Sequence, residues 1–558
     1  MNNLSKLLTA VGVFLALIWS AVTFISFGLP ESACTVLKAV TFGVFNGAID
    51  ALRNGFFYGA PNKNMPTAVF LSLFSIAFFV YFVVVVRIGK SSANVRSLVL
   101  VIMFSILFRL ILLPSVAIHE SDFYRYLWDG KSFKNGINPF KYAPAEVSSA
   151  KAETNQEIKR LKDLRDKNPL YFERINHSGV PTIYPPLAQV VFSASSIIKE
   201  DSIFVLKSIF VFFDILALAL IVLLLSHFKL NPSLVVVYGW SPLVLKEIAN
   251  SGHYDSITIF LTLLSLYFLV KNKALAGSIS LVCASLTKFY PVLLLPLYIK
   301  RIRIRHLLAF AVGVIGMYIP FFIWGHAGTH KVFFGLGIYS QKWAYNGSLF
   351  VIIQSFLNVL HFRIFSNFFL TKLITGFIFV MLLLYLVFKR SDEPLGLSRL
   401  RRRPRPWAWM NAKEKLLGGM SLNGQTIPVC GMTLDIVKQC QGSIQVPRAW
   451  WLCANCPWGV TLKRTLFVLV ALFLLNPVGE PWYFCWAIPF LCFFPYRSLI
   501  LLSWLLIFSY LSFAHDFGTM RVGNLEIPIL NAIQYVPFFL FFIWEFVLRK
   551  RNALDYVK

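Results

Sequence analysis

The chain has 558 residues, of which 57% are hydrophobic and 14% are charged, and its mean hydropathy is +0.67. A water-soluble domain of this length could not bury so much apolar surface, so the composition excludes soluble enzymes and predicts an all-α polytopic membrane protein. The net charge of +28 does not indicate a nucleic-acid partner, because most basic clusters lie in short gaps between apolar runs. That distribution is typical of topology signals and of contacts with anionic membrane lipids.

Apolar runs that are long enough, or nearly long enough, to cross a bilayer follow one another along the chain. They lie at about 7–27, 67–86, 97–118, 204–226, 232–246, 256–270, 306–325, 366–388, 498–514 and 531–548. Two more runs are interrupted: 275–299 contains Lys288 and two prolines, and 465–494 contains "NPVGEPWY". With short limbs counted, the sequence predicts about 11 to 13 membrane helices. The first run is read as a retained span, because it lacks a clear cleavage site of a signal peptide.

Basic segments orient these spans, because short cytoplasmic loops are rich in lysine and arginine. The segments "RIGKSSANVR", "KNK", "KRIRIR", "RLRRRPR" and "RKR" should all be cytoplasmic, as should both termini. "KNK" and "KRIRIR" flank one apolar stretch, so residues 275–299 must enter and leave on the same side with Lys288 near the tip. The same reasoning makes 465–494 a hairpin. Irregular backbone at membrane depth survives only where it lines a protein cavity.

The domain organisation follows from this topology. Residues 1–118 form N-terminal spans, 119–203 an extracytoplasmic helical loop subdomain with interfacial helices, 204–390 central spans, 391–464 a basic cytoplasmic loop, and 465–558 C-terminal spans. The loop 391–464 carries four cysteines, including "CANC". One C-x-x-C pair is weak support for a zinc knuckle, so a disordered loop is the simpler interpretation. The few cysteines elsewhere argue against a disulfide framework.

Five polar segments converge on the predicted extracytoplasmic face. They are "HESDFYRYLWDG" (119–130), "KEIANSGHYD" (246–255), Lys288, "SQKWAYNGS" (340–348) and "NPVGEPWY" (476–483). Charged groups at the mouth of a span are costly and are candidates for function. The carboxylate pair Glu120 and Asp122 could serve as a general base, a metal ligand or a proton site. The structural alternative is a solvated helix end in which Asp122 pairs with Arg125. Asp214, alone within a span, could pair with a lysine on a neighbouring helix.

The first block, "ESDFYRYLWDGKSFKNGINPFKYAP" (120–144) with "TIYPPLAQVVF" (182–192), resembles a signature of bacterial multispanning mannosyltransferases. These enzymes belong to the GT-C superfamily, in glycosyltransferase family 87 or its close relatives. The stretches "WSPLVLKEIANSGHYDSI" (240–257), "LTKFYPVLLLPLY" (286–298) and "NPVGEPWYFCWAIPFL" (476–491) resemble further blocks of that group. Relatives often carry a histidine at the position of Glu480, which puts any role of residue 480 in doubt.

The resemblance implies transfer of a sugar, mannose above all, from a polyprenyl-phosphate carrier to a lipid or glycan acceptor. The reaction would take place on the extracytoplasmic face of the bacterial inner membrane. The acceptor hydroxyl needs a base, and the donor phosphate needs fixed cations. We assign Asp122 as the base with Glu120 beside it, Arg125, Lys288 and Lys246 to the donor phosphate, and Tyr126, Asp129, Tyr184, Asn250, His253, Asp255 and Trp482 to substrate binding. No cofactor is required, and a divalent metal stays unassigned.

Two alternatives stay open at this point. A transporter or flippase of lipid-linked saccharides would also have many spans and buried charges. Against it, the sequence shows no inverted repeat, and its large extracytoplasmic segment lies on one side only. His253 and Asp255 could also simply cap the span that begins near residue 256, and Trp343, Tyr345 and Trp482 could be interfacial aromatics as well as sugar-stacking ones.

Overall fold

The computed structural model describes residues 3–28, 30–40, 49–50, 52–53, 55–56, 64–148, 155–299, 302–360, 366–389, 457–522 and 525–555. Most of this is helical, and the strands found in it form one hairpin. Eight described helices are long and apolar enough to cross a membrane. They are α1 (Asn3–Phe27), α4 (Asn64–Gly89), α5 (Val95–Leu112), α11 (Ile203–His227), α17 (Ile304–Ile323), α20 (Asn367–Phe388), α24 (Pro457–Leu475) and α28 (Ile529–Asp555). The predicted all-α polytopic fold is confirmed.

The region after α11 is broken, where the sequence predicted a span at 232–246. It contains η2 (Pro232–Val235), α12 (Val236–Gly239), α13 (Pro242–Val244) and the π-helical turn η3 (Leu245–Asn250). The segment 242–250 meets α14 (Asp255–Val270) at an angle of 118°. Pro232 and Pro242 lack a backbone N–H and each stands in the first turn of a new helix, the place in a helix that proline favours, which accounts for the breaks before them. This part of the chain therefore turns inside the protein instead of forming a straight span.

The two interrupted runs are also broken where the sequence indicated. Helix α15 (Ala274–Thr287) ends just before Lys288, whose backbone is extended, and η4 (Tyr290–Leu294) and α16 (Leu295–Tyr298) follow. After α24 the chain continues through α25 (Pro481–Phe484), α26 (Ile488–Leu491), α27 (Arg497–Leu505) and η8 (Leu506–Phe513). Among the described residues, full spans number eight, or nine with the bent pair, so the expected 11 to 13 helices would have to include shorter apolar ones.

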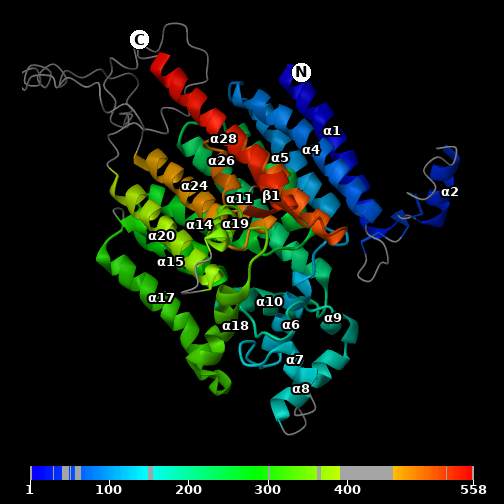
Figure 1. The fold of residues 1–558 in the computed structure, drawn as a ribbon, viewed down its shortest axis with the longest axis vertical. Helices are drawn as coiled ribbons and strands as arrows, with labels where there is room; N and C mark the ends of the chain where they lie inside the picture. Colours follow the sequence, from blue (N-terminus) through cyan, green and yellow to red (C-terminus); the bar gives the residue numbers. More distant parts are fainter. Residues whose placement is uncertain are drawn as a thin grey trace, which may run out of the picture.

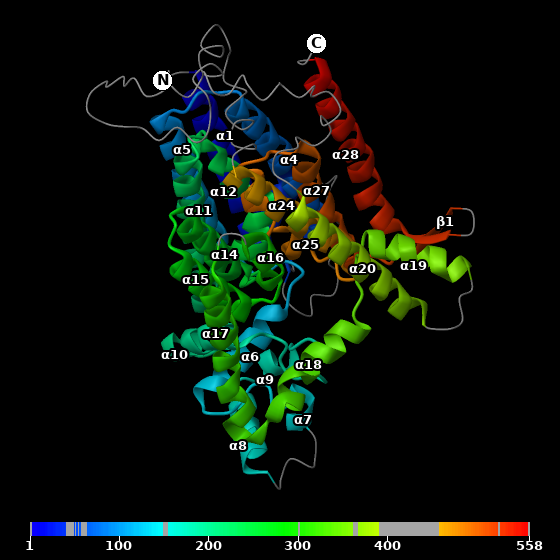
Figure 2. The same cartoon turned by 90° about the vertical axis from the view of Figure 1, so that its left-hand side faces the viewer.

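The segment 119–203 forms a helical subdomain at one end of the molecule. It contains α6 (Asp122–Lys134), α7 (Pro144–Ser148), α8 (Gln156–Asp166), α9 (Pro169–Glu173) and α10 (Pro186–Ile198). Helix α1 begins and α28 ends at the opposite end in both views (Figure 1 and Figure 2). The remaining elements are α2 (Glu31–Val40), η6 (Trp324–His326), α18 (Gly328–Lys342), α19 (Leu349–Val359) and the antiparallel strands β1 (Thr519–Val522) and β2 (Leu525–Pro528).

A buried ion pair joins two of the spans. Arg109 Nε of α5 donates to Asp214 Oδ2 of α11 over 2.6 Å, and both side chains are fully buried. The Tyr238 hydroxyl donates to the other oxygen of Asp214. The prediction that a lysine pairs with Asp214 was therefore wrong, because an arginine of α5 lies beside Asp214. An arginine can also bond two backbone carbonyls at once, those of Ser105 and Gly239, which a lysine at this position could do less well.

Two predictions concern the region 391–464. Residues 391–456, with the four cysteines and the candidate zinc knuckle, lie outside the described residues. The last part, from Pro457 on, belongs to α24, so the C-terminal spans begin earlier than residue 465.

Candidate active site

The loop between α5 and α6 is fixed by side chains from other helices. The amide oxygen of Asn250 accepts the backbone N–H of Ile118, and its nitrogen donates to Ser115 Oγ and the Val116 carbonyl. Lys207 of α11 donates to the Leu112 and Ser115 carbonyls, at the end of α5. These contacts fix the position of the residues that follow. The contacts of Asn250 support a positioning role, where the sequence suggested substrate binding.

Glu120 lies just before α6 and caps its first turn. Its Oε1 accepts the backbone N–H groups of Ser121 and Asp122 over 2.8 and 3.0 Å, a favourable place for a carboxylate at a helix N-terminus. Its Oε2 lies 3.0 Å from His253 Nε2. Burial raises the pKa of Glu120, but His253 and Lys246 outweigh burial and lower it to about 2. Glu120 is therefore ionised at neutral pH and is a poor proton acceptor.

A chain of buried charges continues from Glu120 into η3. His253 Nε2 also lies 3.5 Å from Glu247 Oε2, which lies 3.2 Å from Lys246 Nζ. The Tyr510 hydroxyl donates to Glu247 over 2.8 Å, and the Lys246 ammonium lies 3.6 Å above the centre of the Tyr510 ring. Irregular π-helical turns are frequent at functional sites, and this one carries both Lys246 and Glu247. The positive groups of this cluster are thus already paired with carboxylates.

Asp122, the first residue of α6, has different surroundings. Its Oδ1 accepts a hydrogen bond from Asn176 over 2.5 Å, and its Oδ2 accepts one from the Tyr126 hydroxyl over 3.3 Å. Burial and the neighbouring charge of Glu120 raise the pKa of Asp122 to about 6, against smaller opposing effects of His253, Asn176 and Lys288. Two neighbouring carboxylates with separated pKa values are typical of a site in which one group handles protons.

Lys288 and Asp255 form the other side of the site. Lys288 Nζ lies 2.6 Å from Asp255 Oδ1, which also accepts the indole N–H of Trp486. The ammonium also lies above the rings of Tyr254, Tyr483 and Trp486, at 4.8 to 5.4 Å from their centres. The side chain of Lys288 is 15% exposed, whereas that of Lys246 is 1% exposed. Lys288 is therefore the more accessible of these two cations.

The predicted convergence of the five polar segments is confirmed. Glu120 meets His253, Lys288 meets Asp255, and the Trp482 ring stacks on His253 with centres 4.0 Å apart. The fourth and fifth segments are joined by backbone hydrogen bonds, from Tyr345 N to the Pro477 carbonyl and from Gly479 N to the Tyr345 carbonyl. The site thus combines residues from positions 120, 253, 288, 345 and 482 of the chain.

Other predicted site residues lie inside the loop subdomain. Arg125 is ion-paired with Asp129 at 2.9 Å and donates to the Val180 carbonyl, and both charged side chains are buried. The predicted alternative pairing of Arg125 with Asp122 is therefore not what the structure shows. The Tyr126 ring stacks on Phe192 and meets the Tyr184 ring edge-on. These contacts support a role for Arg125 and Asp129 in holding the subdomain together.

Sequence reasoning missed three residues of the site. Asn176 lies in a stretch without a periodic pattern, so nothing in the sequence indicated its contact with Asp122. Tyr510 lies in an apolar run and reads as a core residue. Glu247 lies within the segment 246–255 and could have been chosen there, since a carboxylate at the mouth of a span is a candidate by default.

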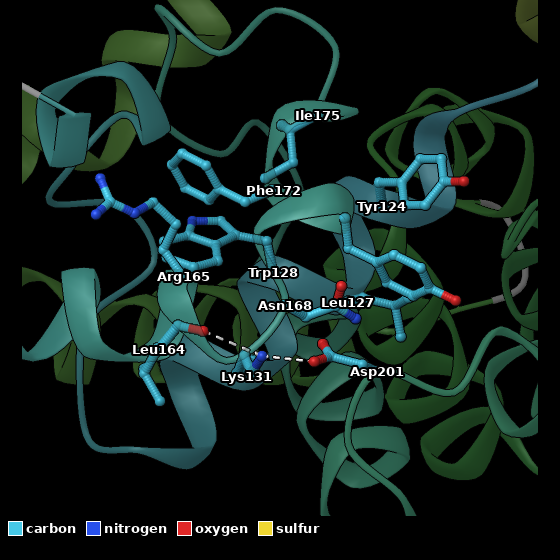
Figure 3. A pocket seen from close by; sticks show the side chains of 11 residues that line it. Tyr124, Leu127, Trp128, Lys131, Leu164, Arg165, Asn168, Phe172, Ile175 and Asp201 are labelled. Atoms are coloured by element: carbon cyan, nitrogen blue, oxygen red, sulfur yellow. Dashed lines mark hydrogen bonds and ion pairs between the residues drawn. The ribbon is translucent and has the colours of Figure 1, made fainter. Parts of the chain in front are cut away.

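The opposite face of α6 lines a separate small pocket. Figure 3 shows Lys131 at its base, where the ammonium donates to the Leu164 carbonyl and to Asp201. Trp128 and Phe172 pack edge-on in its wall. Because its cation is already paired and Asp122 is not among its lining residues, we regard this pocket as part of the packing between α6, α8 and α9.

The described part of the chain contains no group of three or more histidine, cysteine, aspartate or glutamate side chains arranged to hold a metal ion. The spacing of Glu120 and Asp122 resembles a D-x-D pair, but Glu120 bonds two backbone N–H groups and His253. A metal therefore stays unassigned.

Residues 25–302 match the model of the MptA_B family, described as alpha-(1->6)-mannopyranosyltransferase, N-terminal domain. This region includes α6, the segment 246–255 and Lys288. No curated protein sequence and no solved structure matches the chain.

Proposed function

We propose, from the match of residues 25–302 to the model of this mannosyltransferase family, that the chain is a GT-C-type membrane enzyme that takes mannose from a polyprenyl-phosphate carrier. The acceptor is a lipid or glycan hydroxyl on the extracytoplasmic face of a bacterial inner membrane. The family's description suggests an alpha-(1→6) linkage for the product. A donor anchored in the bilayer suits a site built where the spans meet the loop subdomain.

The observation that carries the proposal is the contrast between Asp122 and Glu120. Glu120 is held as an anion by His253 and two backbone N–H groups. Asp122 has no cation within ion-pair distance among the described residues, and its pKa is raised to about 6. A base is most effective when its pKa lies near the working pH. Asp122 is therefore the residue suited to accept a proton from an acceptor hydroxyl.

The proposed step is a single displacement. The acceptor oxygen attacks C1 of the mannose, the bond between C1 and the phosphate oxygen breaks, and the electron pair leaves with the polyprenyl phosphate. The proton of the acceptor hydroxyl passes to Asp122. A β-linked donor would give an α-glycoside by this route. The phosphate is already a good leaving group, so the acceptor is the partner that needs help.

We propose that Lys288 is the main cation for the donor phosphate. It is the most exposed of the three predicted phosphate-binding cations, and its position between three aromatic rings fixes the ammonium. Fixed charges that need no rearrangement stabilise the charge that develops on a leaving phosphate. Asp255, which pairs with Lys288, and His253 with the Trp482 ring stacked on it are our candidates for contacts with the sugar.

The test of this function is reconstitution. The purified full chain in detergent, given a polyprenyl-phosphate mannose and a membrane glycolipid acceptor, should form mannoside without any membrane gradient. No product over a range of acceptors, together with lipid translocation by the same protein in proteoliposomes, would instead favour a flippase.

A further inference from the structure

A fifth carboxylate, Glu480, lies beside the site and differs from the other four in its contacts. It is partly exposed, and it precedes α25 by one residue. Two residues later, Trp482 stacks on His253, which bonds Glu120. Its side chain makes no hydrogen bond and no ion pair with the residues that the structure describes, so its charge, if it carried one, would be unbalanced locally.

The backbone around Glu480 is held rigidly. Val478 forms β-bridges with Tyr345 and Asn346, and the Asn346 amide donates to the Gly479 carbonyl over 3.1 Å. Gln534 of α28 exchanges two hydrogen bonds with the Asn346 side chain, each 3.0 Å long. A Cβ on Gly479 would lie 2.3 Å from the Asn346 carbonyl oxygen, so only glycine fits there. The backbone that carries Glu480 is therefore fixed in place beside the site.

The cations nearby are already engaged. Lys246 pairs with Glu247, Lys288 pairs with Asp255, and His253 lies between two carboxylates. The charged and titratable groups that act on Glu480 come from several elements. They are Glu120 and Asp122 near the start of α6, Lys246 and Glu247 of η3, Tyr339 of α18, Tyr345 in the following loop, Tyr483 of α25, Tyr510 of η8 and Tyr535 of α28.

Resting on the proposed function, we propose that Glu480 is a protonated carboxylic acid at neutral pH and donates a hydrogen bond from its O–H to the anionic phosphate of the donor. Burial and the charges of Glu120, Asp122 and Glu247 raise the pKa of Glu480 well above its usual range, and Lys246 offsets them only in part. An unpaired carboxylate close to like charges takes up a proton. An ionised Glu480 would repel the phosphate, whereas the neutral acid can bind it.

The protonation state can be tested without any substrate. The infrared difference spectrum between the wild type and E480Q at pH 7 should show the C=O stretch of a carboxylic acid, which E480Q lacks. The control variant is E526Q, because Glu526 is exposed and ion-paired with Arg521, so its difference spectrum should show the bands of a carboxylate. Carboxylate bands in the E480Q difference spectrum would overturn the proposal, whatever the enzymatic activity turns out to be.

The role toward the donor is tested by two variants at the same position. E480Q keeps a hydrogen-bond donor of similar shape and should retain the rate within a few fold, whereas E480A should lose about tenfold to a hundredfold in kcat/KM for the donor. The acid limb of the pH profile should stay near the value for Asp122 in E480Q, because no negative charge is removed. Equal rates for E480Q and E480A, or an acid limb that moves to lower pH in E480Q, would overturn the assignment.

Discussion

The hydrogen bond from Asn176 to Asp122 allows a sharp test of the base. The amide nitrogen lies 2.5 Å from Asp122 Oδ1, and it favours the ionised form of the carboxylate. A hydrogen bond to a charged group is worth about 1.5–3 kcal/mol. Because Asp122 is partly exposed, we take a hydrogen-bond free energy slightly below the lower limit of this range. Loss of the bond should then raise the pKa of Asp122 by about one unit.

The variant N176A should therefore move the acid limb of the pH profile upward, from about 6 in the wild type to about 7. Because the active form carries an ionised Asp122, the rate should fall about twofold at pH 7 and about fivefold at pH 6, and it should return to the wild-type plateau near pH 9. The assay is kcat measured with saturating donor and acceptor between pH 5 and 9.

The control variant is N155A. Asn155 caps α8 through the N–H groups of Glu157 and Ile158 and makes no contact with Asp122, so its loss should leave the acid limb unchanged. The reasoning is refuted if N176A leaves the acid limb in place, or if its rate falls by the same factor at every pH.

Three further predictions concern other parts of the structure. D214N should destabilise the protein by about 3–5 kcal/mol, because it leaves the charge of Arg109 buried and unpaired, and thermal unfolding in detergent should show it; D166N, at an exposed pair, should have little effect. G479A should lower both the unfolding temperature and the activity, because its Cβ would meet the Asn346 carbonyl oxygen at 2.3 Å, whereas G376A has open space and should behave like the wild type. K288Q should raise the KM for the donor about tenfold or more. The control K134Q, whose lysine pairs with Glu200 outside the site, should leave this KM unchanged. Unchanged donor affinity in K288Q would show that Lys288 does not bind the phosphate.

Much of the fold could be predicted from the sequence, because span length and hydropathy are set by the thickness of the bilayer. The break at Lys288 followed from the two basic segments that flank it, and the structure ends α15 there. The broken path at 232–250 was missed, since its apolar composition matches that of a straight span. The partner of Asp214 was also misjudged, because sequence alone does not show which of several helices packs against α11.

The sequence predicted where the candidate site lies better than it predicted the contacts within it. Polar groups beside apolar runs pointed to residues 120–130, 246–255 and 476–483, and these segments do meet. The pairing within the site depends on three-dimensional geometry. Nothing in the sequence could show that His253 holds Glu120 while Asn176 holds Asp122, and it is this difference that separates the pKa values of the two carboxylates.

The most direct test of the central claim is the turnover of D122N with saturating donor. This variant keeps the shape of the side chain and removes its basicity, so we expect a loss of about 10²- to 10⁴-fold in kcat with unchanged expression and donor affinity. E120Q should lower kcat less than D122N does. If the two variants are equally impaired and a chelator inhibits the wild type, Glu120 and Asp122 bind a metal together. Near-full turnover of D122N would contradict the account, and Glu120 or Asp255 would then have to be tested as the base.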